Sequence, residues 1–416
     1  MKIEQYIGAF KKMYWQFTDD GFSDLLRNTN TLNTKVIAST SIFPELVKLE
    51  DDYHLIWDMK YWDLFDNYIR YVAFFLRDKL NDEAVKLCQH NIHKIIFEFL
   101  VCKMSKYPLI SYCIARDILR GLPTYHRIED GALCKKFTDK TPSGKLMQAR
   151  MYVLLHETYH YEYKTYPKMY NEDVSTINQI LNHIYDHKIH LSLTTLSGKE
   201  KQMYFDTIKS LLHGKNPTLL EEIACNYRAF IQLYDWIKRD FRYAEDKYIL
   251  QDIIETIRIS RQFQSELSQI NNSWDVSVSA FDDLFRDLKV EKDISQIERY
   301  DEQFGYMCSL LTKKNLKQVS IRHENEILQK KQRSLLQNEI IYQVILVHSI
   351  KKYNILSEFE MNSKIKIDKY LLPVVESITD WELVVKTYMT AKILSLHTTF
   401  NPLQIIEARN MLMTWK

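Results

Sequence analysis

The sequence has few of the residues that break secondary structure. Glycine and proline each occur only 8 times in 416 residues, well below their average usage of about 7% and about 5%. No glycine-rich phosphate loop or nucleotide-binding fingerprint is present. Because 46% of the residues are hydrophobic, the chain has enough apolar side chains to build real cores. The composition therefore predicts a mainly α-helical protein with few tight turns.

Cysteine pairs, long apolar runs and a strong net charge are also missing. The six cysteines form no Cys-x-x-Cys pair, which gives no indication of a disulfide framework or a cysteine zinc site. The first residues lack the features of a signal peptide, and no run approaches the roughly 18 apolar residues of a membrane span. We therefore expect a cytoplasmic protein without a membrane partner. The net charge of +2 gives no reason to expect nucleic acid as a partner.

The stretch from Tyr152 to Tyr161 contains the motif His-Glu-x-x-His. On a helix, His156 and His160 project from the same face and can bind one Zn²⁺, while Glu157 can act as general base on a bound water. Apolar residues surround the motif on nearly all sides, which predicts a buried helix. Buried histidines and a carboxylate need a metal or one another. We interpret the motif as a zinc site; the alternative is a hydrogen-bonded core cluster of His and Glu.

A catalytic zinc with two histidines needs a third protein ligand. In metzincins a glycine and a histidine would follow at fixed offsets, but those positions hold Tyr163 and Tyr166. The remaining common arrangement takes a glutamate from a later helix. A helix predicted to start near 217 offers two such residues, Glu221 and Glu222.

Helical phase favours the second of these glutamates. Glu221 falls on a polar stripe and is expected to be solvated, whereas Glu222 lies among small and apolar residues and needs a partner. We therefore prefer Glu222 as the third ligand, with Glu221 and an ordinary surface Glu-Glu pair as the alternatives. Asn226, one turn later, is expected to support a ligand by a hydrogen bond.

Other residues are candidates for additional roles. His183, His187 and His190 share one face of a helix predicted over 174–190, which indicates either a metal or catalytic role or a solvated helix edge. His90 and His93 are three apart on another predicted helix, and an ordinary surface pair is the preferred interpretation. Peptide hydrolysis also needs a donor for the oxyanion. The candidates, which the sequence does not rank, are Tyr161, Tyr166, His187 and Arg228.

The predicted organisation has three parts. Residues 1–120 are expected to form a helical N-terminal region, residues 121–245 a zincin-like catalytic core, and residues 246–416 a helical C-terminal region that regulates the core or binds a substrate or partner. Asp130-Gly131 is a turn signal for a short antiparallel hairpin between 124 and 139. A strand edge next to the metal-binding helix would suit an extended peptide.

The motifs resemble those of known proteases. His156-Glu-Thr-Tyr-His160 followed by Glu222-Ile-Ala-Cys-Asn226 resembles the gluzincin, or thermolysin-like, arrangement. The second segment is similar to that of ImmA/IrrE-type proteases and of Lit-like phage-exclusion peptidases. The resemblance covers about residues 120–240. It implies an intracellular bacterial zinc protease that cleaves a particular protein in stress response, mobile-element control or phage defence, with His156, His160 and Glu222 as ligands and Glu157 as base.

Two functions follow as hypotheses. The first is a zinc-dependent endopeptidase whose partners are a protein or peptide substrate and a regulatory protein bound through the C-terminal helices. The second is a non-catalytic helical regulatory protein, in which the same residues form a structural metal site or a hydrogen-bonded cluster. Bound metal and the effect of replacing Glu157 distinguish the two hypotheses.

Overall fold

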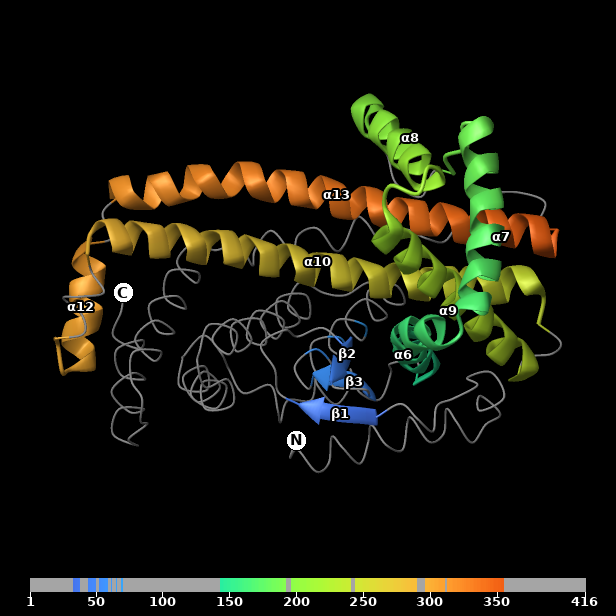
Figure 1. Cartoon of the computed structure of the whole chain (residues 1–416), viewed down its shortest axis with the longest axis horizontal. Helices are drawn as coiled ribbons and strands as arrows, with labels where there is room; N and C mark the ends of the chain where they lie inside the picture. The colour runs from blue at the N-terminus through green and yellow to red at the C-terminus, as the bar shows by residue number, and fades with distance from the viewer. Residues whose placement is uncertain are drawn as a thin grey trace, which may run out of the picture.

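In the computed structural model, the described part of the chain is mostly helical, in agreement with the composition (Figure 1). The structure describes residues 33–37, 44–49, 52–58, 61, 65, 69, 143–191, 196–240, 244–289, 296–310 and 313–354. The hairpin predicted over 124–139, as well as His90 and His93, lie outside these residues. Among the described helices, none is long and apolar enough to cross a membrane.

Two long helices are the largest elements of the described part of the chain. Helices α10 (Asp246–Asp287) and α13 (Lys313–Tyr353) run side by side along the length of the molecule, with the shorter α12 (Tyr300–Leu310) between them in the chain (Figure 1). Their pairing is antiparallel, because Ser265 hydrogen-bonds Ser334 while Arg261, one turn earlier, hydrogen-bonds Asn338, one turn later. The pair packs against α6 (Ser143–Thr165) and α9 (Pro217–Asp240).

Helix α6 carries the His-Glu-x-x-His motif and packs mainly against α9, with further contacts to α10. The nine residues from Met151 to Tyr159 are all buried, so the prediction of a helix buried on nearly all sides is confirmed. One cluster of buried hydrophobic residues runs from α6 and α9 into α10 and α13. The proposed metal-binding helices and the C-terminal helices therefore share one core, on both sides of the boundary predicted at 245.

Helices α7 (Pro167–Asp186) and α8 (Gly198–Leu212) cover the other side of α9 (Figure 1). Pro167 occupies the first turn of α7, where its missing N–H is tolerated, and a capping box between Ser197 and Glu200 starts α8. Helix α7 ends at Asp186 and not at 190 as predicted, because Lys188 adopts a left-handed backbone conformation with φ of 52°. His190 therefore lies beyond the helix, and the predicted shared face of three histidines does not form.

Three strands lie beside α6: β1 (Asn33–Ile37), β2 (Glu45–Leu49) and β3 (Asp52–Asp58). Their order is β1-β3-β2, with β1 parallel and β2 antiparallel to β3. These strands lie in the region 1–120 that is predicted from the sequence to be helical, so the prediction is wrong for them. Strand β2 is at one edge of the described sheet and contacts α6. The mainly helical fold class is confirmed, while a zincin-like core stays a prediction.

Candidate metal centre

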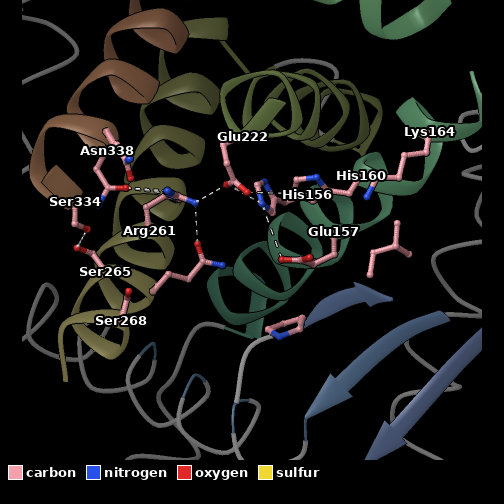
Figure 2. Close-up of a pocket in the computed structure, with 14 residues that line it drawn as sticks. His156, Glu157, His160, Lys164, Glu222, Arg261, Ser265, Ser268, Ser334 and Asn338 are labelled. Atoms are coloured by element: carbon pink, nitrogen blue, oxygen red, sulfur yellow. Dashed lines mark hydrogen bonds and ion pairs between the residues drawn. The ribbon is translucent and has the colours of Figure 1, made fainter. Parts of the chain in front are cut away.

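The two motif histidines point from α6 toward one place (Figure 2). Residues four apart on a helix lie on the same face, and the ring centroids of His156 and His160 are 5.0 Å apart. Both side chains are largely shielded, with 5% and 15% of their surface exposed. The helix thus presents two imidazoles at the bottom of a pocket.

Glu222 from α9 completes the group. Its Oε2 lies 3.5 Å from Nε2 of His156 and its Oε1 lies 3.4 Å from Nε2 of His160. One ligand atom from each of the three residues can be chosen so that all lie within 4.8 Å of one another. These are the three ligands predicted from the sequence, and the packing of α6 against α9 brings them together. That they bind a metal stays a prediction.

The donor set fits a zinc ion by chemistry and by spacing. Two nitrogens and a carboxylate are the ligands of many catalytic zinc sites. Donors about 2.1 Å from a tetrahedral metal are about 3.4 Å apart, and each oxygen of the Glu222 carboxylate lies near this distance from one histidine nitrogen, at 3.5 Å from His156 and 3.4 Å from His160. Three protein ligands also leave a fourth position for water or substrate. The residues could therefore hold a divalent metal of the catalytic type.

Glu157 lies next to this group. It is 8% exposed, its Oε1 is 4.0 Å from Nε2 of His156, and it lines the same pocket. A carboxylate beside the three donors is in the right place to take a proton from a water bound among them. The placement agrees with the role that the motif predicts for Glu157.

Glu221 is not the solvated residue that the sequence analysis expected. Its Oε1 lies 2.8 Å from Nδ1 of His160, on the side of the ring opposite to Glu222. A carboxylate at the second nitrogen of a histidine fixes the orientation of the ring and makes it a better ligand. His156 has no such support, because its Nδ1 is buried without a hydrogen-bond partner in the described part of the chain.

The surroundings determine the protonation of the two histidines. Burial lowers the pKa of His156 to about 3, so its ring is neutral, as a metal ligand must be. Burial also acts to lower the pKa of His160, but Cys225 and the two adjacent glutamates outweigh it and raise the pKa well above the usual value. Burial acts to raise the pKa of Glu222, yet His160, His156 and Arg261 hold it far below the usual range. Without a metal, His160 and Glu222 therefore form an ion pair.

Asn226 is close to the site and hydrogen-bonds the predicted ligand Glu222 at its backbone oxygen. Its Nδ2 donates to the backbone oxygen of Glu222 at 2.6 Å, and its Oδ1 accepts a hydrogen bond from the Tyr152 hydroxyl on α6. Both helices that carry the donors are thus tied together by this fully buried amide. Asn226 therefore supports the site through the backbone of Glu222.

The four predicted oxyanion donors lie elsewhere. None of them is among the side chains that line the pocket. The ring of Tyr161 packs edge-on against Tyr53 at 5.5 Å, and Tyr166 stands at the junction of α6 and α7. His187 is exposed at the end of α7, and Arg228 forms an ion pair with Asp173 at 3.5 Å. The reason is helical phase, which turns these side chains toward the sheet, other helices or solvent.

The pocket above the metal centre has a volume of about 490 Å³ and a largely polar lining. One wall, which we call the α10–α13 wall, consists of Arg261, Gln264, Ser265, Ser268, Ser334, Gln337 and Asn338. Leu46 of β2 and Pro44, just before this strand, contribute the apolar part of the lining. None of the residues of this wall was predicted from the sequence, in which no chemistry was assigned after residue 245. The pocket also includes the three candidate donors in its lining.

The comparisons with known proteins give no relative. No protein-family model, no curated protein and no solved structure matches the chain.

Proposed function

We propose that the chain is a zinc-dependent endopeptidase. The observation that carries the proposal is the group formed by His156, His160 and Glu222, whose ligand atoms lie within 4.8 Å of one another in an open pocket that Glu157 also lines. In this proposal the first three residues bind the metal and Glu157 is the general base. The third ligand is Glu222 and not Glu221, because Glu221 bonds the far nitrogen of His160.

In this proposal, each residue of the site has a separate chemical role. A zinc ion in the site supplies a Lewis acid for the peptide carbonyl and lowers the pKa of water. Glu157 removes a proton from the attacking water and passes it to the nitrogen of the leaving amine. Glu221 holds the ring of His160 in place.

Two features support a peptide as the substrate. The pocket is open and mostly polar, which suits a backbone rich in donors and acceptors. Strand β2 lies at the edge of the described sheet and contacts α6, and Leu46 of this strand lines the pocket. An extended peptide can bind such an edge by backbone hydrogen bonds. The substrate would thereby run past the three donors, next to Glu157.

The biological setting follows from the motif resemblance alone. Proteases of the ImmA/IrrE and Lit-like types are intracellular bacterial enzymes that cleave particular proteins, and we propose a cytoplasmic role of this kind in stress response or phage defence. The α10–α13 pair forms one wall of the pocket, so a regulatory protein that binds these helices would act directly on access to the site. This supports the C-terminal helices as the place of regulation.

A second candidate is a non-catalytic regulatory protein. It is favoured by the contacts of His160, which pairs with Glu221 on one side and Glu222 on the other and thus needs no metal to be satisfied. Against it, structural zinc sites usually have four protein ligands in a closed site, whereas this group has three and opens into a pocket. The endopeptidase is therefore the better proposal.

The proposal is tested by metal content and by cleavage products. We expect one zinc per wild-type chain by mass spectrometry of the purified protein, none in His160→Ala and an unchanged amount in Glu157→Gln. Bacteria that express the wild type should contain new protein N-termini that are absent with Glu157→Gln. If the new N-termini persist with Glu157→Gln while zinc is retained, the mechanism is wrong. If zinc is bound but no protein is cleaved, the regulatory protein is the correct alternative.

A further inference from the structure

An arginine from a distant part of the sequence reaches the metal centre. Arg261 on α10 extends toward Glu222, and its Nη1 lies 3.7 Å from Oε2 of that carboxylate (Figure 2). The arginine side chain is 14% exposed and lines the pocket. A positive charge is thus held beside the third donor, on the side that faces the pocket.

Hydrogen bonds to Asn338 and Gln264 hold the guanidinium of Arg261 in place. Its Nε and Nη2 both donate to Oδ1 of Asn338 on α13, at 3.1 and 3.0 Å, and its Nη1 donates to Oε1 of Gln264 at 3.2 Å. These bonds come from both helices of the α10–α13 pair. A planar guanidinium that is held at three of its N–H groups keeps its direction, and such prior fixation is what electrostatic stabilisation of a transition state requires.

The guanidinium of Arg261 also has N–H groups left to bind a ligand. Arginine carries five N–H donors, and three of them make the bonds to Asn338 and Gln264. The approach to Glu222 at 3.7 Å is an ion pair and is too long for a hydrogen bond. One N–H on Nη1 and one on Nη2 are therefore not used in hydrogen bonds within the described structure. They are available to a negatively charged oxygen in the pocket.

Among the described residues that line the pocket, Lys164 is the other lysine or arginine, and its position is different. Lys164 lies at the end of α6, beyond His160, while Arg261 lies on the opposite side of the donors (Figure 2). Lys164 is exposed, so its charge is screened by water and its flexible side chain has no fixed direction. Of the two, only Arg261 is both shielded and held in place next to Glu222.

We propose that Arg261 is a catalytic residue that stabilises the oxyanion during peptide hydrolysis. The inference rests on the proposed function and adds the donor that the sequence did not identify. When the water oxygen bonds to the carbonyl carbon, Glu157 takes the water proton and the C=O π electrons move to the carbonyl oxygen. Arg261 donates an N–H to that negative oxygen. The C=O bond then re-forms as the C–N bond breaks, and the nitrogen leaves with its electron pair and receives the proton from Glu157.

The binding of a small oxyanion tests this role without a known substrate. The protein is loaded with Co²⁺, which has a visible spectrum, and titrated with inorganic phosphate as a tetrahedral anion. We expect Arg261→Met to weaken phosphate binding roughly ten- to a hundredfold, the loss of one charge-assisted hydrogen bond. The matched control is Lys164→Met, which removes the same charge from the exposed side and should change the affinity by less than about threefold. Cobalt content should stay at one per chain in both variants.

A second variant keeps the test valid if Arg261→Met does not fold. Asn338→Ala leaves the charge in place but removes the acceptor that holds Nε and Nη2, so phosphate should bind several-fold more weakly. Unchanged phosphate affinity in a folded, cobalt-loaded Arg261→Met protein, or in Asn338→Ala, would overturn the assignment of Arg261. A wild-type protein that binds no metal would instead contradict the proposed function itself, so the two failures are distinguishable.

Cleavage adds a second readout once a substrate has been found by its new N-termini. Removal of one oxyanion donor lowers kcat by roughly a hundred- to a thousandfold in other hydrolases. We expect a loss of this size for Arg261→Met with little change in KM, because the bond forms only as negative charge develops. A change confined to KM would show that Arg261 binds the substrate and does not act in the chemical step.

Discussion

Glu221 Oε1 lies 2.8 Å from Nδ1 of His160, although the neighbouring residue in the chain, Glu222, faces the opposite nitrogen of the same ring. Two consecutive glutamates on α9 therefore hold one imidazole from both sides. The arrangement gives each carboxylate a separate task. Glu222 is a donor to the metal in the proposed site, and Glu221 is the partner that sets which nitrogen of His160 carries the proton.

The first prediction concerns this supporting carboxylate. Glu221→Gln keeps the size of the side chain but removes its charge, so the His160 ring should be held less firmly and be a poorer ligand. We expect zinc affinity to fall roughly ten- to a hundredfold, measured by competition with a chelator of known affinity. The matched control is Glu298→Gln, at an exposed position away from the pocket. Equal affinities in the two variants would show that Glu221 has no role in the site.

The sequence predicted the part of the site that local geometry determines. The spacing of His156 and His160 fixes their common face once a helix is assumed, and the apolar residues around them fix its burial. Helical phase also selected Glu222. Phase gives the direction of the Cβ atom but not the reach of a flexible side chain, which is why Glu221 was expected in solvent although it bonds His160.

Contacts between distant segments could not be predicted from the sequence. Arg261 and Asn338 are 77 residues apart, and only the antiparallel packing of α10 and α13 brings them to the pocket. Nothing in the composition near Arg261 sets it apart from a surface arginine on an amphipathic helix. The end of α7 was missed for a related reason, because Lys188 takes a left-handed conformation that glycine would usually signal.

The second prediction is that zinc stabilises the folded protein. A ligand that binds only the folded state adds about 2.7 kcal/mol to the free energy of unfolding when its free concentration is about 100 times its Kd. We expect urea unfolding to show an increase of this order with zinc compared with EDTA. His160→Ala should lose the increase, while Glu157→Gln should keep it, because Glu157 is not one of the three donors. An equal response of His160→Ala and the wild type to zinc would place the metal elsewhere.

The third prediction separates Arg228 from Arg261. Arg228 Nε lies 3.5 Å from Oδ2 of Asp173, which also accepts a hydrogen bond from Tyr163. Burial raises the pKa of Asp173 and the Arg228 charge opposes that rise. Arg228→Met leaves this shielded carboxylate without its cation, so the free energy of unfolding should fall by about 1–3 kcal/mol, less than for a fully buried pair.

The matched control for this variant is Arg286→Met, which breaks a pair with Asp283 in which the arginine is 70% exposed. Such exposed pairs contribute little, so its stability should stay close to that of the wild type in the same urea titration. Phosphate affinity of the cobalt-loaded protein should be unchanged in Arg228→Met. A loss of phosphate binding there would restore Arg228 as the oxyanion donor and contradict its structural role.

The last prediction is a dependence of stability on pH that arises outside the metal centre. His348 on α13 is half-buried, and burial, together with nearby Lys352, lowers its pKa to about 4. Its Nδ1 lies 3.2 Å from the Tyr227 hydroxyl, and its Nε2 is buried without a hydrogen-bond partner in the described structure. In the unfolded chain its pKa is about 6.5. Between these two values the unfolded state binds more protons, so the stability contributed by His348 is present above about pH 6.5 and is lost as the pH falls toward 4.

The corresponding measurement compares the free energy of unfolding in urea at pH 7 and pH 4.5. His348→Gln keeps a hydrogen-bonding group near Tyr227 but cannot titrate, so it should lose about 1–2 kcal/mol less than the wild type over this range, a value reduced for solvent screening. His213→Gln, at an exposed position after α8, is the control and should follow the wild type. If His348→Gln also follows the wild type, another group governs the acid sensitivity, because the groups common to both proteins cancel in the difference.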